Sequence, residues 1–237
     1  LFSKMPELPE VETIVNQLRA KILGKIIQRA EILDPQVVDS NIITQLPFKI
    51  NNIRRRGKSI IFDIGKSHHL LTHLRMTGHF HYLDSPEKNS NYQKYCVAKF
   101  HLNDHSLLTH NSIRRFGRMT LMNKVQLKEA LSSLGPEPLD PQFTPEQFNQ
   151  LLQQNPNAVI KSRLLNQSVI AGIGNIYAQE ALYHARINPS HKIGTIPEAK
   201  LTKLHQELIK ILKLAIQKNG TTVENYTSLD GKAKRYC

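Results

Sequence analysis

The chain has 237 residues, a length that suits one large domain or two modest ones and suffices to bury a core. No apolar run reaches the roughly 18 residues of a membrane-spanning helix, so no integral membrane protein is expected, and 2 Cys exclude a disulfide framework and a four-Cys zinc site. The formal net charge of +13 favours a polyanionic partner, nucleic acid first, over a basic surface that binds nothing.

A helix is predicted over residues 10–24, where Gly24 supplies a C-terminal stop. Its apolar residues recur at the i, i+3, i+4 and i+7 positions of one helical face: Val11, Ile14, Val15, Leu18 and Ile22. Between Val37 and Met122 the composition changes to short runs of β-forming residues, several of them separated by turn-like sequences. An antiparallel β-sandwich or barrel is predicted from these runs, which cover residues 59–64, 69–74, 79–83, 95–102, 106–109 and 118–122.

The stretch 134–141 is the best candidate for an interdomain linker, because three of its eight residues are Pro and one is Gly. Beyond it the pattern is helical, and Thr144 followed by Gln147 predicts a capping box. The expected helices cover residues 144–154, 158–165, 175–185 and 198–219. We therefore predict an α+β protein with an N-terminal helix and β-sandwich domain in 5–133, a linker in 134–141 and an all-helical domain in 142–237.

A first basic cluster directly precedes the predicted strand 59–64. Arg54, Arg55, Arg56 and Lys58 place four cations in five residues, which predicts a concentrated phosphate-binding spot at the strand entrance. A solvated charged loop is the alternative interpretation of the same run.

A second basic cluster lies in a predicted loop between two strands. It contains Arg114, Arg115 and Phe116, followed by Gly117 and Arg118. An aromatic side chain among cations suits a probe of stacked bases, because Phe can wedge between base steps while Arg fills the vacated hydrogen-bonding space. The alternative is a Phe buried in the sandwich with exposed Arg neighbours.

Two further segments carry candidate chemistry. In the segment 166–177, Gly172, Gly174 and Asn175 precede a predicted helix whose backbone N–H groups could approach an anion. A helix–turns–helix that grips a DNA backbone fits this segment better than a nucleotide-phosphate loop, and a tight interhelical turn is the alternative. At the start, Pro9 and the acidic residues suit a helix N-terminus, but that interpretation does not require Pro6 and Glu7.

Together these blocks resemble the bacterial formamidopyrimidine-DNA glycosylase family (the Fpg/Nei enzymes), in family order from Met5 to about Lys232. The opening Pro-Glu-Leu-Pro-Glu-Val-Glu-Thr is similar to the Fpg branch, since the Nei branch usually has Gly where this chain has Leu8. The resemblance implies a bifunctional DNA glycosylase and abasic-site lyase of base excision repair. It would remove oxidised purines, such as 8-oxoguanine and formamidopyrimidines, from double-stranded DNA. A monomer in the bacterial cytoplasm, associated with the nucleoid, is implied as well.

The resemblance also implies catalytic roles. Pro6 corresponds to the family's N-terminal proline, whose secondary amine attacks the sugar and forms an imine. Glu7 matches the acid–base carboxylate, Glu10 a second carboxylate that orients the site, and Lys58 a lysine that contacts the lesion phosphate and assists elimination. Because an amide-bonded proline nitrogen is not nucleophilic, we expect Met5 to be the true start and its removal to free Pro6.

DNA contacts are implied at further positions. Met76, Arg114 and Phe116 match the trio that fills the gap left by an extruded nucleotide, and Lys161 and Asn175, with Gly174, match backbone-phosphate contacts of a helix–two-turn–helix. The loop that closes over the damaged base is expected to begin at Gly220, Thr221 and Thr222.

The chain departs from the family pattern in several places. Family members end in a zinc finger with four Cys, whereas this chain has only Cys96 and Cys237, so no metal is expected in it. Ser112-Ile113 replaces the usual Asp-Pro, Tyr95-Cys96 the usual His-Asp, and Glu224 stands where many members carry a basic residue. Two alternatives remain: a damaged-DNA or abasic-site binding protein without catalysis, and a Nei-like glycosylase for oxidised pyrimidines.

Overall fold

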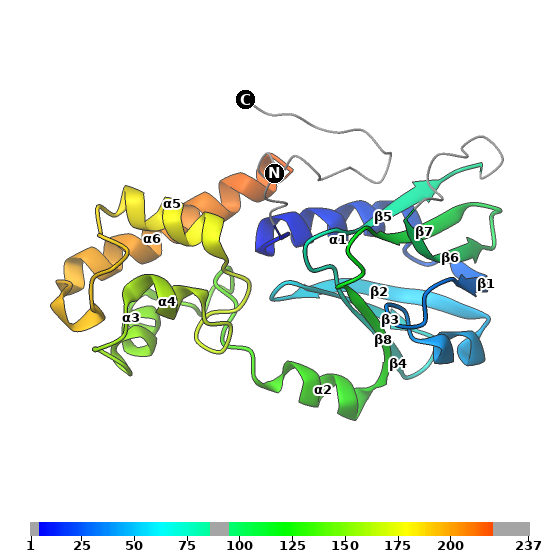
Figure 1. Ribbon diagram of the computed structural model, residues 1–237, viewed down its shortest axis with the longest axis horizontal. Coiled ribbons are helices and arrows are strands. Elements are labelled where there is room, and N and C mark those ends of the chain that lie inside the picture. Colours follow the sequence, from blue (N-terminus) through cyan, green and yellow to red (C-terminus); the bar gives the residue numbers. More distant parts are fainter. Residues whose placement is uncertain (1–4, 86–94, 220–237) are drawn as a thin grey trace.

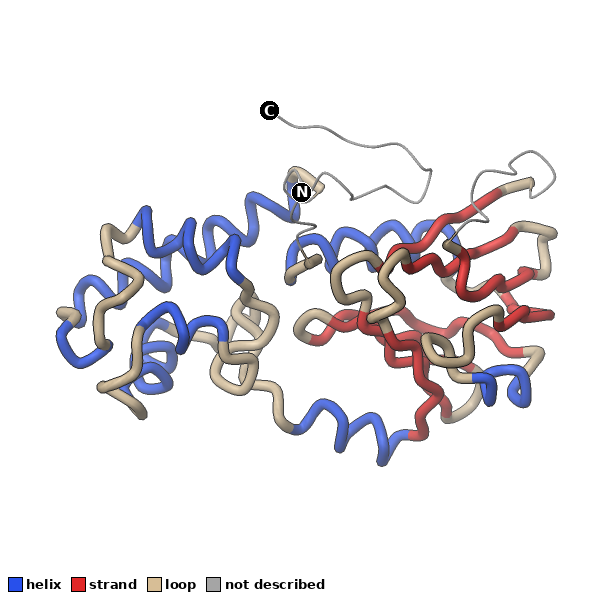
Figure 2. Tube along the Cα trace, viewed as in Figure 1, coloured by secondary structure: helices blue, strands red, loops and turns tan. Residues whose placement is uncertain are grey.

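The computed structural model describes residues 5–85 and 95–219, and it separates β-strands on one side from a group of helices on the other (Figures 1 and 2). The strands are β1 (Ile26–Ile32), β2 (Phe48–Arg56), β3 (Ser59–Ile64), β4 (His68–His73), β5 (Gly78–Leu83), β6 (Cys96–Leu102), β7 (Leu107–Ser112) and β8 (Arg118–Asn123). The helices are α1 (Leu8–Ile22), α2 (Lys124–Ser132), α3 (Pro145–Gln153), α4 (Ile160–Leu165), α5 (Asn175–His184) and α6 (Glu198–Gln217). The predicted α+β class is confirmed.

The strands follow the order β5-β7-β6-β1-β2-β3-β4-β8, and every ladder between these strands is antiparallel. β2 turns the sheet into two layers, because Phe48 and Lys49 pair with β1 while the residues from Ile50 onward pair with β3. Between the layers the ring of Phe62 meets that of Phe80 edge to face, with centroids 5.9 Å apart. A β-sandwich, as predicted, is the result.

Helix α1 packs against β2 and β3 and also against α6, so it touches both halves of the molecule (Figure 1). The apolar face predicted from the sequence is buried, with each of its members at most 5% exposed: Val11, Ile14, Val15, Leu18 and Ile22. The helix begins two residues before the predicted start, at Leu8 with Pro9 in its first turn. Leu8 itself packs in the core of the helical half rather than in the sandwich.

Three elements were not predicted. β1 has only one fully buried residue, Ile27, and β2 ends in Arg54, Arg55 and Arg56, so neither strand shows a regular alternation. Because Arg54, Arg55 and Arg56 belong to β2, the alternative interpretation of this run as a solvated charged loop is wrong. In α2 the single buried residue is Leu127, which leaves no apolar stripe to detect.

The remaining helices surround their own core, and α3 begins at Pro145 with Thr144 as its N-cap, whose hydroxyl accepts the N–H of Gln147 at 3.3 Å. The predicted capping box is only half formed, because the N–H of Thr144 donates to Gln142 O at 2.9 Å instead of to the side chain of Gln147. The stretch 134–141 contains neither helix nor strand. It is hydrogen-bonded nonetheless: Gly135 N–H donates to Gln167 O at 2.9 Å, and Ala171 N–H donates to Pro136 O at 3.0 Å. The exact domain boundaries stay predictions. Within the described residues no helix has the length and apolar character needed to cross a membrane.

Candidate active site

Glu7 lies where the two halves meet. It precedes α1, yet its carboxylate reaches the start of α5 in the helical half: Oε1 accepts the N–H of Ile176 at 2.9 Å, and Oε2 accepts that of Tyr177 at 3.4 Å. The free N–H groups and the positive end of the helix dipole favour a carboxylate there. Gly174 makes the approach possible, since a Cβ on it would lie 2.3 Å from Cδ of Glu7. The residue expected to contact DNA therefore also leaves room for a buried acid.

Glu10 is fully buried directly behind Glu7. Its Oε2 accepts the backbone N–H of Glu7 at 2.9 Å, and its Oε1 accepts the hydroxyl of Tyr177 at 2.5 Å. Tyr177 was not singled out from the sequence. The available signal was its place in the first turn after the glycine-rich segment, where a buried tyrosine needs a partner for its hydroxyl.

Lys58 occupies the turn between β2 and β3 and shares an electrostatic cluster with both carboxylates. Burial lowers the pKa of Lys58, while the negative charges of Glu7 and Glu10 act in the opposite direction. Burial raises the pKa of Glu7, opposed by the Ile176 N–H and by the charge of Lys58. Pro6, half-buried, is bonded directly to Glu7. The structure thus brings together the residues to which the resemblance gave catalytic roles.

His73 joins this cluster without having been predicted. It ends β4 opposite Ser59, the residue after Lys58. Burial, then the nearby charges of Arg75 and Lys58, lower the pKa of His73 to about 4, and its Nδ1 lies 3.1 Å from the N–H of Arg75. A ring that stays neutral at physiological pH can accept this bond from the backbone. A lone His at a strand end gives no sequence signal of such a position.

The second basic cluster lies, as predicted, in a loop between β7 and β8. Arg114 is exposed, its Nη1 lies 3.2 Å from Sδ of Met76, and its N–H donates to the hydroxyl of Thr77 at 2.9 Å. Phe116 is 61% exposed, so the alternative of a Phe buried in the sandwich is wrong. The side chain of Arg115 is 68% exposed and pairs with Asp34 at 3.4 Å. An exposed aromatic ring beside cations is available for contact with bases.

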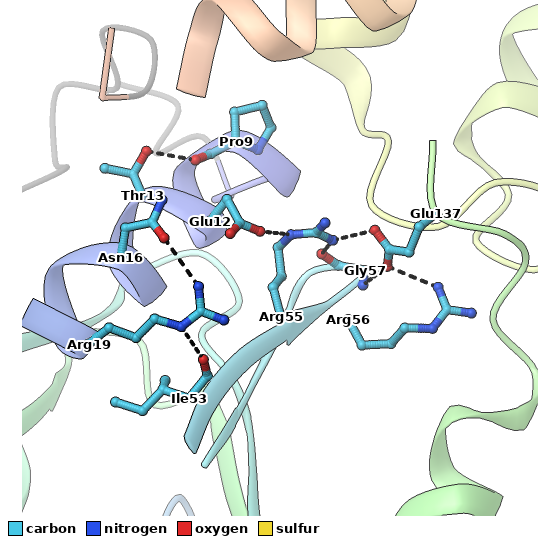
Figure 3. Close-up of polar contacts among 10 residues, drawn as sticks. All are labelled: Pro9, Glu12, Thr13, Asn16, Arg19, Ile53, Arg55, Arg56, Gly57 and Glu137. Atoms are coloured by element: carbon cyan, nitrogen blue, oxygen red, sulfur yellow. Dashed lines mark hydrogen bonds and ion pairs between the residues drawn. The ribbon is translucent and has the colours of Figure 1, made fainter. Parts of the chain in front are cut away.

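The arginines of the first basic cluster have carboxylate partners inside the protein, and Figure 3 shows those of Arg55 and Arg56. Arg55, with a side chain only 8% exposed, pairs with Glu12 at 2.7 Å and with Glu137 at 2.6 Å. Arg54 pairs with Asp63 at 3.2 Å. These pairs neutralise the arginines locally and give them a structural role, while the expected phosphate contact of Arg54 and Arg55 stays a prediction.

The remaining predicted residues are found in or beyond the helical half. Lys161 is the second residue of α4, and Asn175 is the first of α5, where its exposed side-chain amide donates to Gln179 at 3.3 Å. Thr221 and Thr222 lie outside the described residues. No cluster of His, Cys, Asp or Glu suited to a metal ion occurs within residues 5–85 and 95–219, and the chain has too few Cys for a four-Cys zinc site.

Comparisons with known proteins identify two matched regions. Residues 5–119 match the formamidopyrimidine-DNA glycosylase N-terminal domain, and residues 134–227 match the formamidopyrimidine-DNA glycosylase H2TH domain. A protein of Symbiobacterium thermophilum named formamidopyrimidine-DNA glycosylase is 38% identical over 234 residues, covering 96% of this chain and 75% of the relative. One of Streptococcus agalactiae with the same name is 36% identical over 241 residues, covering 98% and 86%.

Solved structures agree with the sequence comparisons. A complex between a Lactococcus lactis FPG variant and DNA containing Fapy-dG aligns with a TM-score of 0.88 at 31% identity, covering 97% of this chain and 85% of that one. The Lactococcus lactis Fpg bound to DNA with an abasic site aligns with a TM-score of 0.87 at 31% identity, covering 96% and 84%. On its matched domains, the identity of its relatives and its fold, this chain belongs to the formamidopyrimidine-DNA glycosylase family.

Proposed function

We propose that this member of the DNA glycosylases of base excision repair removes oxidised purines, such as 8-oxoguanine and formamidopyrimidines, from double-stranded DNA and then cuts the strand at the abasic site. The observation that carries the proposal is the cluster of Glu7, Glu10 and Lys58 beside Pro6, at the junction of the two halves. Relatives named formamidopyrimidine-DNA glycosylase, and similar structures that hold Fapy-dG or an abasic site, support it.

The nucleophile of the proposal is the nitrogen of Pro6. As a chain-terminal secondary amine it has a pKa near that of other α-amino groups, about 8, so a useful unprotonated fraction exists near neutrality. It attacks C1′ of a flipped-out nucleotide, forming a C–N bond as the bond to the damaged base breaks. The base leaves with the bonding electron pair and takes up a proton, and the amine loses its own proton. The C1′–O bond of the sugar ring then breaks with protonation of the ring oxygen, which leaves an iminium ion between Pro6 and C1′. The proposal requires Met5 and the residues before it to be absent, because an amide nitrogen has no available lone pair.

Glu7 is suited to deliver a proton to the sugar ring oxygen as the ring opens. Because burial raises its pKa, a larger fraction of its carboxyl groups is protonated near neutrality than of exposed Glu side chains. Lys58, whose pKa burial lowers, contacts the lesion phosphate in the proposal and assists elimination. In that step C2′ loses a proton and the C3′–O bond breaks, so the phosphate leaves and the strand is cut.

Borohydride trapping tests this function. Protein that begins at Pro6 is mixed with a duplex carrying a single 8-oxoguanine, and reduction is expected to yield a covalent complex together with a cut strand. The same chain beginning at Leu1 is the matched control and should give no covalent complex. If the Pro6 form is trapped neither on 8-oxoguanine nor on an abasic site but still binds the duplex, the protein is a damaged-DNA binder. Faster excision from oxidised-pyrimidine duplexes in competition would assign it the Nei-like preference.

A further inference from the structure

The turn between β2 and β3, which carries Lys58, contacts residues of the linker and of the helical half. Arg56 and Ser59 form the last pair between β2 and β3, so Gly57 and Lys58 alone make the connection. Gly57 has a φ of 56°, a left-handed conformation that favours glycine. It is buried against the other half of the molecule: a Cβ built on it would lie 3.5 Å from Leu134 and 3.7 Å from Ala171. The position of Lys58 therefore depends on how this turn is docked.

Glu137, from the stretch between α2 and α3, makes the polar contacts that dock the turn (Figure 3). Its Oε1 accepts the N–H of Gly57 at 2.6 Å and Nη1 of Arg56 at 2.9 Å. Its Oε2 pairs with Nη1 of Arg55 at 2.6 Å. One carboxylate thus binds three consecutive residues immediately before Lys58.

The arginines around Glu137 favour a negatively charged carboxylate at this position over a neutral side chain. Arg55 is nearly buried and has two anionic partners, Glu12 from α1 and Glu137. Arg56 donates besides to the carbonyl oxygens of Leu134 at 2.9 Å and Gly135 at 2.6 Å, so it stays attached to the linker without Glu137. Removing the Glu137 charge leaves the nearly buried Arg55 with one carboxylate partner instead of two, and it weakens the acceptor that holds the Gly57 N–H.

We propose that Glu137 is a positioning residue for Lys58: by clamping Arg55, Arg56 and the Gly57 amide, it fixes the lysine in the cluster with Glu7, and it acts on elimination rather than on attack by Pro6. This inference rests on the proposed function. Its physical basis is that Glu137 binds the backbone one residue before Lys58, whereas the carboxylate of Glu7 is held by the amides of α5. A misplacement of about 1 Å in a catalytic group can cost up to about a hundredfold in rate.

The test compares Glu137→Gln with Glu12→Gln, which removes the other carboxylate of Arg55 but leaves the turn contact. Both proteins begin at Pro6 and act on a duplex with a preformed abasic site. For Glu137→Gln we expect strand cleavage to slow about tenfold or more while the borohydride-trapped fraction stays within about twofold. The part of the cleavage pH profile that depends on Lys58 is identified as the part that Lys58→Ala abolishes. In Glu137→Gln this part should move to higher pH, because a less firmly held lysine is better hydrated and its pKa rises. Glu12→Gln should change neither.

A second readout does not depend on activity. The Lys58 side chain is titrated by NMR in protein labelled on lysine and free of DNA, and its pKa should rise in Glu137→Gln but not in Glu12→Gln. An unchanged Lys58 titration, an equal loss of trapping and cleavage, or the same effect in Glu12→Gln would overturn the inference. If the parent protein is not trapped but the Lys58 pKa still rises in Glu137→Gln, the proposed function is refuted while the positioning of Lys58 by Glu137 is not. Should Glu137→Gln not fold, the double variant Arg55→Gln/Glu137→Gln removes the nearly buried cation as well and undergoes the same two measurements.

Discussion

At the scale of single residues, the carboxylate of Glu7 combines two properties that have opposite effects on its pKa. It is buried, which raises its pKa, and it is hydrogen-bonded to amides at the start of α5, which oppose that rise. The bonds hold the group in one orientation, and burial keeps its proton available. Neither property is visible in the sequence, since the amides belong to residues about 170 positions further along the chain.

Glu7→Gln is predicted to lose base excision while it keeps DNA binding. The amide has nearly the same shape and retains an oxygen acceptor for α5, but it cannot deliver a proton. We expect single-turnover excision of 8-oxoguanine to fall by about 10²- to 10⁴-fold, the usual contribution of general acid catalysis. Duplex affinity, measured by fluorescence anisotropy, should change less than about threefold, by roughly the effect of a neutral substitution. Equal losses of excision and affinity would contradict the assignment.

His110 gives a prediction about stability rather than catalysis. It is fully buried in the sandwich, stacked on Phe80 at 4.8 Å, and within the described residues neither of its ring nitrogens has a hydrogen-bond partner. Burial, and then the charge of His79, lower its pKa from 6.5 to about 3. Below pH 6.5 the unfolded chain therefore takes up a proton that the folded chain does not, and the free energy of unfolding falls as the pH falls.

His110→Phe removes this dependence of the free energy of unfolding on pH and keeps an aromatic ring stacked on Phe80. The gain in the free energy of unfolding, relative to the parent, should be larger at pH 5 than at pH 7 by about 2 kcal/mol. Urea unfolding at the two pH values measures the difference. His191→Gln, at an exposed position, is the control for the loss of a histidine elsewhere in the chain. A gain for His110→Phe that is the same at both pH values would show that the histidine is charged or paired in the folded state.

At the scale of elements, the structure shows which patterns a sequence can disclose. Helix α1 was predictable because its buried residues follow the helical period, and β3 because its apolar residues are bounded by turns. β2 was not predictable, because it ends in arginines, and the carboxylates that pair with them, Asp63 and Glu137, come from other segments of the chain. The residues of the candidate site also fall into a group that the sequence indicates and a group that only the structure shows. The resemblance indicated Glu7, Glu10 and Lys58, but the contacts that Tyr177 and Glu137 make are long-range and follow no local spacing.

The start of α5 supports a prediction about one element. Gly174 has its missing Cβ aimed at Glu7, with Cδ at 2.3 Å and Oε1 at 2.4 Å, distances that no side chain tolerates. Gly174→Ala should push the carboxylate away from the Ile176 and Tyr177 amides and slow excision at least about a hundredfold. Gly194→Ala is the control within the same half, because its Cβ would also be crowded, at 3.1 Å from Pro156, but its nearest neighbours do not include Glu7. Normal excision by Gly174→Ala would mean that Glu7 does not act from this position.

At the scale of the whole molecule, the two halves meet through the candidate catalytic residues themselves. Glu7 and Leu8 reach from the sandwich half into the helical half, and Glu137 reaches back to the turn before Lys58. The catalytic geometry therefore exists only while the halves keep this arrangement. Not every one of the 32 Lys and Arg is available to DNA, because Arg55 at the junction is already paired with Glu12 and Glu137.

The difference between paired and free cations predicts the salt dependence of DNA binding. If the free cations neutralise roughly six phosphates, affinity should fall about 10³-fold between 50 and 200 mM salt. Lys161→Gln should reduce the slope of log affinity against log salt by about one, the effect of one lost phosphate contact. Arg54→Gln removes an equal charge, but Arg54 already pairs with Asp63 at 3.2 Å, so the slope should not change. If Arg54→Gln lowers the slope as much as Lys161→Gln, the arginine leaves Asp63 for a phosphate when DNA binds, and its charge belongs to the part that is available to DNA.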